Sequence, residues 1–464
     1  MLFQTIVNVF KIEELRNKIL FTLGMLVVYR IGFWIPLPGV NQAQLIQYFQ
    51  SQTQAGTGFG RLATYVSVFS GGSFGQSTIF GLGIMPYITA AIIFQLLGSA
   101  SPALKKLREE GPTGTQKIQE WTRYMTVGLC IIQAIGWLTF ITTQGLVYPE
   151  WKGNPLWWAM CITALTAGTI FMMWLGEQID RYGIGNGVSL IIMAGILSRM
   201  PNALIWVWQN FEPGDQTKMG WMGLLLLVAG FILVIAGSVL ITVAQRRIPV
   251  QQAKHTRGRR VYGGQRSYLP LRVNHGGVMP IIFASSLMIF PSVIFGALYE
   301  QAQNSGAAGW WLGTTRWFND AFAMGQFPYI LLYVLMVYFF SYFWITVQFN
   351  PEEMSKQLRD HGSFVPGLRP GPRTAEYLET VMERITYVGA AFLAIIAVLP
   401  MVVNRELNIS FMVTQFLGGT GLLIVVSVAL DFLQRVEANL LMRNYAGFLG
   451  GGADQKAPRM RSGR

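Results

Sequence analysis

Residue types that commonly carry out chemistry are few in this chain and stand far apart. The three histidines, His255, His275 and His361, fall in polar connecting segments, so their spacing does not predict a metal cluster. Cys130 and Cys161 lie inside apolar runs and indicate no disulfide framework. The motifs G-x-x-x-x-G-K-[ST], H-E-x-x-H and G-x-S-x-G do not occur. The sequence therefore predicts no enzyme, no cofactor and no metal site.

Ionisable groups inside apolar segments, which ion-coupled transporters need, are also sparse. Glu177, Asp180 and Asp431 stand at the ends of apolar runs, where water reaches them. A pathway between such segments would be lined mainly by apolar side chains. These could form a constriction that blocks ions by dewetting and remains deformable. Ile84 and Ile88 are spaced one helical turn apart, on one face of a helix. Both isoleucines could line this constriction; the alternative is that they contact lipid or serve ordinary packing.

Composition indicates a polytopic helical membrane protein. The 464 residues are 52% hydrophobic and 12% charged, whereas globular proteins carry about 25% charged residues. Ten apolar segments are expected to cross a bilayer with modest tilt. They are 19–38, 77–98, 122–143, 155–176, 184–201, 220–244, 277–297, 328–349, 385–403 and 411–432. The first segment has no small-residue cleavage site, so we expect it to be a retained span. The expected fold class is all-α.

Basic residues alternate along these connections as the positive-inside rule requires. Of the 35 Lys and Arg residues, 28 lie in the terminal segments and the even-numbered connections, and 6 lie in the odd-numbered connections. The pattern predicts that both termini are cytoplasmic. The remaining basic residue, Arg30, lies within the first span, where we expect it to snorkel or to pair within the bundle; a direct functional role is the alternative.

The second and seventh spans share the pattern Gly-x-Met-Pro-x-Ile-x-Ala, which begins at Gly83 and at Gly277. Each is the second span of a five-span half. Because five is an odd number, the two halves must be inverted relative to each other. Inverted repeats place the functional site between the halves, near the middle of the membrane.

The segment 61–72 is apolar but too short to cross a bilayer, and it precedes a longer apolar run at 79–97 that contains Pro86. Non-helical backbone at membrane depth persists only inside protein or against a water-filled cavity. The two segments together therefore indicate a pathway through the membrane with a segment seated in it. The alternative is an interfacial helix before an ordinary span.

Small polar residues on the two related spans, Thr89 and Gln95 on one and Ser285 and Ser286 on the other, could bond across a helix interface or serve ordinary packing. Two even-numbered connections, 245–275 and 350–384, are long and basic. Such loops suit an RNA or an acidic protein partner. Anionic lipid headgroups together with membrane topology are the alternative explanation for their charge.

Eight short motifs are spread in order along nearly the whole chain. They are PLPG at 36–39, FSGG at 69–72, GIMPYI at 83–88, WLGEQI at 174–179, GIGNG at 183–187, IFASS at 282–286, FNP at 349–351 and FVPGLRPG at 364–371. Together they resemble the motifs of the SecY family of protein-conducting channels in its bacterial form.

The resemblance implies an hourglass channel made of two inverted five-span halves, with a short re-entrant plug helix in the outer funnel. The plug corresponds to 61–75 and includes Leu62, Tyr65, Val66, Val68, Phe69, Gly71 and Gly72. A ring of isoleucines would close around a translocating chain. The positions that match this ring are Ile84, Ile88, Ile192, Ile282 and Ile424.

The resemblance also implies a lateral gate, formed by spans 2 and 3 facing spans 7 and 8, through which membrane segments enter the lipid. Residues that match its polar contacts are Gln95, Asn186, Ser285 and Ser286. Arg259, Arg260 and Arg369 match the family's docking sites for the SecA motor ATPase or the ribosome. Further partners implied are SecE-like and SecG-like small membrane subunits, polypeptides that carry signal sequences, and membrane lipids.

The expected organisation is therefore a cytoplasmic amphipathic N-terminus, two halves joined by an outer connection, and a basic cytoplasmic tail. The boundaries are 1–18, 19–201, 202–219, 220–432 and 433–464. A secondary transporter would share the inverted repeat but should bury ionisable or ligand-binding groups at midplane. A membrane-embedded enzyme would need a catalytic pair within the spans. Both remain alternatives, to be separated by solute counter-transport and by turnover assays.

Overall fold

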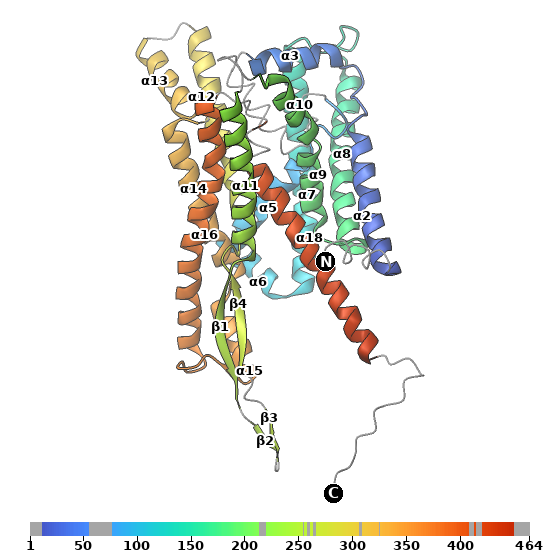
Figure 1. Ribbon diagram of the computed structural model, residues 1–464. Coiled ribbons are helices and arrows are strands. Elements are labelled where there is room, and N and C mark those ends of the chain that lie inside the picture. The colour runs from blue at the N-terminus through green and yellow to red at the C-terminus, as the bar shows by residue number, and fades with distance from the viewer. Residues whose placement is uncertain are drawn as a thin grey trace.

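The computed structural model is a mostly helical bundle with a β-ribbon at one end (Figure 1). The residues that the structure describes are 12–54, 77–212, 220–253, 255–257, 260–262, 266–305, 309–323, 325–407, 413 and 420–449.

The described part of the first half forms five long helical passages and two short helices. The passages are α2 (Glu13–Gly32), α5 (Met85–Ala100), α7 (Pro112–Thr143), α8 (Pro155–Tyr182) and the consecutive pair α9 (Gly187–Leu197) and α10 (Met200–Asn210). The short helices are α3 (Gln42–Gln54) and α6 (Pro102–Glu109). The outer connection expected at 202–219 is thus helical up to Asn210.

The second half repeats this plan with longer connections. Its long helices are α11 (Trp221–Val243), α12 (Met279–Asn304), α14 (Phe327–Gln348), α16 (Pro372–Leu407) and α18 (Thr420–Leu449). The short helices α13 (Gly309–Ala321) and α15 (Pro351–Asp360) lie in the connections. Each of the ten expected spans overlaps one of the helices of the two halves.

Six helical stretches within the described residues are long and apolar enough to cross a membrane. They are Pro112–Thr143, Pro155–Tyr182, Gly187–Asn210, Trp221–Val243, Phe327–Asp360 and Pro372–Leu399, and a shorter apolar helix runs from Met85 to Gly98. The prediction of a polytopic helical membrane protein is confirmed, while the count of ten crossings stays a prediction.

The second expected span, 77–98, is helical only from Met85. The residues before it are held in turns because their backbone groups bond to another segment. The N–H of Leu37 donates to the carbonyl of Ser77 at 2.9 Å, and the N–H of Ile79 donates to the carbonyl of Ile35 at 3.0 Å. Pro86 then occupies the first turn of α5, where its missing N–H costs no helical hydrogen bond.

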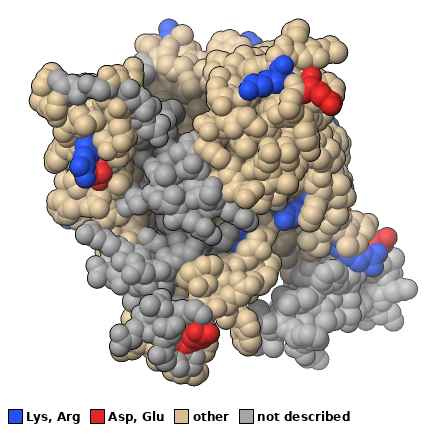
Figure 2. All heavy atoms as spheres, turned by 90° about the horizontal axis from the view of Figure 1, so that it is seen from above, with Lys and Arg blue, Asp and Glu red and all other residues tan. Residues whose placement is uncertain are grey.

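The connection 245–275 forms a twisted β-ribbon, an addition to the all-α prediction. The paired strands are β1 (Gln245–Gln252) and β4 (Arg266–Arg272), with β2 (His255–Arg257) and β3 (Arg260–Tyr262) at the tip and β5 (Ser363–Phe364) on the other edge of β1. The ribbon projects from the end of the bundle opposite α3 and α13 (Figure 1). That opposite end, seen in Figure 2, shows few charged side chains among the described residues.

Much of the bundle's outer surface is apolar, as lipid contact requires. The helix α11, for example, exposes Leu225, Leu233 and Leu240. The largest buried cluster instead gathers side chains from both halves, and it contains the residues considered next.

Candidate functional site

The five isoleucines that match the ring lie together in one buried hydrophobic cluster. Their exposed fractions are 1% for Ile84, 6% for Ile88, 7% for Ile192, 3% for Ile282 and 1% for Ile424. They come from the start of α5, from α9, from the start of α12 and from α18, that is, from both halves of the chain. The cluster around them consists of aliphatic and aromatic side chains from both halves.

The sequence repeat at Gly83 and Gly277 is also a repeat of backbone geometry. Both glycines adopt the left-handed conformation, with φ of 61° and 59°, which only glycine enters without strain. In each repeat a helix begins two residues later, with a proline in its first turn. As a result, Ile88 and Ile282 are each the fourth residue of their helix.

The first turns that carry these isoleucines are closed in the same way. The N–H of Ile88 donates to the carbonyl of Ile84 at 3.1 Å, and the N–H of Ile282 donates to the carbonyl of Val278 at 3.2 Å. The helix α5 leads toward α6 at the ribbon end, whereas α12 begins after the ribbon and leads to α13 at the opposite end (Figure 1). The two repeats therefore run in opposite directions, as an inverted repeat requires.

The two halves pack closely along one pair of helices and make less extensive backbone contact along another boundary. The helix α9 of the first half packs along α18 of the second half. In contrast, α5 packs against α6, α7 and α8, and α12 packs against α13 and α14. Among the described residues, no extensive backbone contact joins α5 or α7 to α12 or α14. We call this boundary between α5/α7 and α12/α14 the seam.

The residues that match the gate's polar contacts lie on or near the helices of the seam, but the bonds described for them stay within each half. The hydroxyl of Ser285, which is fully buried, lies 3.1 Å from that of Tyr333 on α14. The side chain of Asn186 caps α9 by accepting from the N–H of Ser189 at 3.0 Å. Gln95 is half-buried on α5. The side chain of Ser286 lies outside the described part.

The carboxylates at the span ends each have a defined partner. Arg123 on α7 binds Glu177 on α8, with Nη2 and Oε1 2.8 Å apart. Asp180 accepts the N–H of Gly187 at 2.7 Å. Asp431 pairs with Arg435 one turn along α18, at 2.9 Å. These contacts are structural and lie at the ribbon end of the bundle, so they do not form a midplane ligand site.

The two long basic connections form a single unit, which the sequence did not predict. Strand β5 pairs with β1, and the N–H of Ala253 donates to the carbonyl of Gly362 at 2.8 Å. A separate apolar cluster holds the connections onto α16. Its buried members are Ile248, Leu271, Val365, Leu378, Met382 and Ile385. The signal available in the sequence was the spacing of Ile248 and Val250, two apolar β-branched residues two positions apart, which are both buried in β1.

The residues that match the docking sites are placed only in part. Arg260 lies on β3 at the tip of the ribbon, opposite Arg257, and Arg259 falls outside the described residues. Arg369 is exposed, and its carbonyl accepts from the hydroxyl of Thr374 at 2.9 Å. The plug residues also fall outside the described residues. They are Leu62, Tyr65, Val66, Val68, Phe69, Gly71 and Gly72.

Comparison with known proteins decides the family. The sequence model named SecY matches residues 78–433, more than half of the chain. The chain belongs to the SecY family. It is 40% identical over 459 residues to the protein translocase subunit SecY of Chlamydia trachomatis, covering 96% of this chain and 98% of that protein. The SecY of Halalkalibacterium halodurans is also 40% identical, over 453 residues, covering 97% of this chain and all of that protein.

Solved SecY-family structures have the same fold. A protein-conducting channel matches with a TM-score of 0.57 at 18% sequence identity, covering 95% of each chain. Sec61 in the canine ribosome–channel complex from the endoplasmic reticulum matches with a TM-score of 0.53 at 17% identity, covering 95% of each chain. At these identities the likeness shows the fold alone, and the family rests on the sequence matches.

Proposed function

We propose that this chain is the channel subunit of a protein translocase. It passes unfolded secretory polypeptides across the cytoplasmic membrane of a bacterium and releases transmembrane segments sideways into the lipid. The chain itself is a passive conduit, and the driving energy comes from a bound motor or ribosome. Relatives that are about 40% identical over nearly their whole length carry the name protein translocase subunit SecY, which supports this function.

The single observation that carries the proposal is the cluster of five isoleucines where the two halves meet. Ile84, Ile88 and Ile192 come from the first half, and Ile282 and Ile424 from the second. Aliphatic side chains form no hydrogen bonds, so they can move apart around a polypeptide and come together again. When they are in contact, they exclude water and thereby block ions. In our proposal they form the pore ring, and the segment 61–75 is the plug that fills the outer funnel.

The seam supports a lateral exit for membrane segments. The helices α5 and α7 make no extensive described backbone contact with α12 and α14, whereas α9 and α18 tie the halves together elsewhere. Opening at the seam would therefore break few helix contacts. We assign Gln95, Asn186, Ser285 and Ser286 to this gate.

The partners follow from the basic cytoplasmic unit and from the family. In our proposal both termini are cytoplasmic, because 28 of the 35 basic residues lie in the terminal segments and the even-numbered connections. Arg259, Arg260 and Arg369 would contact SecA or the ribosome. Sec61 and yeast Ssh1, which share the fold, are described in ribosome-bound complexes. We expect SecE-like and SecG-like subunits to cover part of the apolar outer surface.

Reconstitution tests the proposal. The chain with its small subunits is placed in proteoliposomes with SecA, ATP and a polypeptide that carries a signal sequence. We expect the polypeptide to become resistant to external protease, and the same polypeptide without its signal sequence to remain sensitive. Counter-transport of a labelled small solute without protection of any polypeptide would overturn the proposal in favour of a secondary transporter.

A further inference from the structure

The short helix α13 (Gly309–Ala321) lies in the connection between α12 and α14, at the end of the bundle opposite the β-ribbon (Figure 1). Its sequence, GWWLGTTRWFNDA, contains three tryptophans in thirteen residues. The channel mechanism proposed above assigns no role to this helix. Its two faces differ in a way that identifies its environment.

One face of α13 packs on the protein. The ring of Phe318 stacks on Phe295 of α12, with centroids 4.8 Å apart and planes inclined by 12°. Phe322, just beyond α13, stacks on the same Phe295 ring at 4.9 Å. Beside the stack, a Cβ built on Gly296 of α12 would lie 3.8 Å from Oδ1 of Asn319, which is ordinary van der Waals distance. The helix is therefore fixed to the outer part of α12.

The other face of α13 exposes large apolar rings. Trp310 is 73% exposed and Trp317 is 63% exposed. They are seven residues apart, which is close to two full turns, so both lie on the same side of the helix. The exposed ion pair of Arg316 with Asp320, 3.8 Å apart, flanks this tryptophan face. A helix surrounded by water would gain nothing from two exposed indole rings beside its charges.

This combination fits the region between lipid headgroups and acyl chains. Tryptophan concentrates there because its ring is apolar and its N–H remains hydrated. The chain itself fixes the depth, since α13 connects the outer ends of two long apolar helices. Other exposed tryptophans, Trp208 near the end of α10 and Trp221 at the start of α11, stand at corresponding helix ends.

We propose that α13 is an interfacial anchor that lies in the outer leaflet, with Trp310 and Trp317 inserted among the lipids. The partner is the lipid surface itself. Through the stack of Phe318 and Phe322 on Phe295, the anchor holds the outer part of α12 at the membrane surface. The inner part of α12, which carries Ile282 and Ser285, lies on the other side of Pro291.

The test places a fluorescent reporter on the tryptophan face. Cys130 and Cys161 are first replaced by alanine, and Trp310→Cys and Trp317→Cys are made separately and labelled with an environment-sensitive dye. The full complex is reconstituted, and quenching is compared for lipids spin-labelled at a shallow position, lipids spin-labelled at a deep position, and iodide present on both sides. Leu233→Cys on the lipid-facing surface of α11 is the deep control, and Arg359→Cys on α15 is the aqueous control.

We expect the shallow lipid to quench both α13 reporters at least twofold more than the deep lipid or iodide does. Strong quenching by iodide would place the face in water and overturn the proposal. Protection from all three quenchers would overturn it as well, because a protein subunit would then cover the tryptophans. If a tryptophan variant fails to fold, Thr314→Cys reports from the same exposed side of α13 with a smaller change. The quenching measurement does not require translocation, so its result tests the anchor independently of the proposed function.

Discussion

The hydroxyl groups of Ser285 and Tyr333 lie 3.1 Å apart in the buried contact between α12 and α14. The family resemblance implies that Ser285 is one of the polar residues of the lateral gate, and ordinary packing is the alternative. Its described partner, Tyr333, belongs to the neighbouring helix of the same half. The bond therefore ties two helices on one side of the seam into a unit.

This relationship predicts a measurable coupling. Tyr333→Phe leaves the buried Ser285 hydroxyl without this partner, and we expect it to lower the free energy of unfolding in detergent by about 1 kcal/mol. Ser285→Ala should cost a similar amount, and the double variant should cost less than the sum of the two. Strictly additive losses in this double-mutant cycle would show that the two hydroxyls do not interact.

The isoleucine cluster predicts the permeability of the resting channel. Replacing Ile88 or Ile282 by serine puts a hydroxyl into an apolar constriction and favours its wetting. We expect ion conductance of proteoliposomes to rise severalfold, while Ile→Val at the same positions, which keeps the surface apolar, should change it little. Serine variants that are folded and as tight to ions as the parent would contradict the pore-ring assignment.

The exposed Arg369, in the second long basic connection, predicts a selective defect. Arg369→Glu reverses the charge of an exposed side chain, so the thermal midpoint should stay within a few degrees. Transport driven by SecA or the ribosome should nevertheless fall at least tenfold. Arg373→Glu, an exposed reversal four residues away, is the matched control. Equal activity of both variants and the parent would remove the docking assignment.

His275 predicts a pH dependence of stability at the base of the ribbon. Burial first, and then the nearby positive charge of Arg272, lower the pKa of this imidazole below its usual value. The folded state therefore holds His275 neutral, packed edge-on against Phe349 with ring centroids 6.2 Å apart. The unfolded chain binds a proton more readily, so this contribution is complete above about pH 6.5 and is lost as the pH falls below that value.

The thermal midpoint of the parent should accordingly fall more steeply between pH 6.5 and pH 5 than that of His275→Gln, which cannot titrate. The difference between the two thermal midpoints, plotted against pH, separates the contribution of His275 from those of the carboxylates and the other histidines. Parallel curves for the two proteins would show that His275 does not couple its protonation to folding.

The sequence predicted those features that depend on local pattern. Apolar runs located helices, and the pattern repeated at Gly83 and Gly277 identified two equivalent helix starts, because a left-handed glycine followed by a proline is a local signal. The pairing of β5 with β1 could not be predicted, since it joins segments more than 100 residues apart, and backbone hydrogen bonds carry no sequence signal. The same limit applied to Ser285, whose partner 48 residues away is set by how α12 packs on α14.

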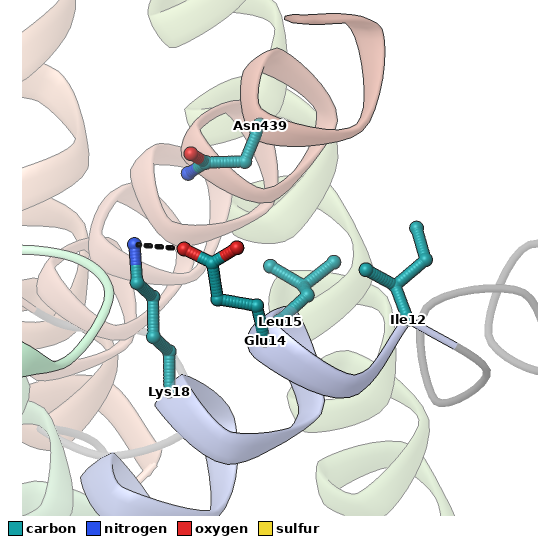
Figure 3. A pocket seen from close by; sticks show the side chains of 5 residues that line it. All are labelled: Ile12, Glu14, Leu15, Lys18 and Asn439. Carbon is teal, nitrogen blue, oxygen red and sulfur yellow. Dashed lines mark ion pairs between the residues drawn. The ribbon is translucent and has the colours of Figure 1, made fainter. Parts of the chain in front are cut away.

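The approach of α2 to α18 is another packing detail that the sequence did not predict. A small surface pocket of about 30 Å³ lies between the start of α2 and the second half of α18. Figure 3 shows Lys18 paired with Glu14 on its rim, at 3.9 Å, and Asn439 facing them from α18. Both helices were expected, but their close approach at the ribbon end depends on the small apolar cluster of Leu15, Ile184 and Val436.

The central claim is that an unfolded polypeptide passes through the isoleucine cluster, and crosslinking tests it most directly. A photoreactive or disulfide-forming probe on a stalled secretory chain is presented to Ile88→Cys or Ile282→Cys, in a channel whose Cys130 and Cys161 have been replaced. The account predicts crosslinks at both positions that appear only when the stalled chain is present. If both positions stay unreactive while a lipid-facing control such as Leu233→Cys reacts, the polypeptide does not pass through this cluster and the account is wrong.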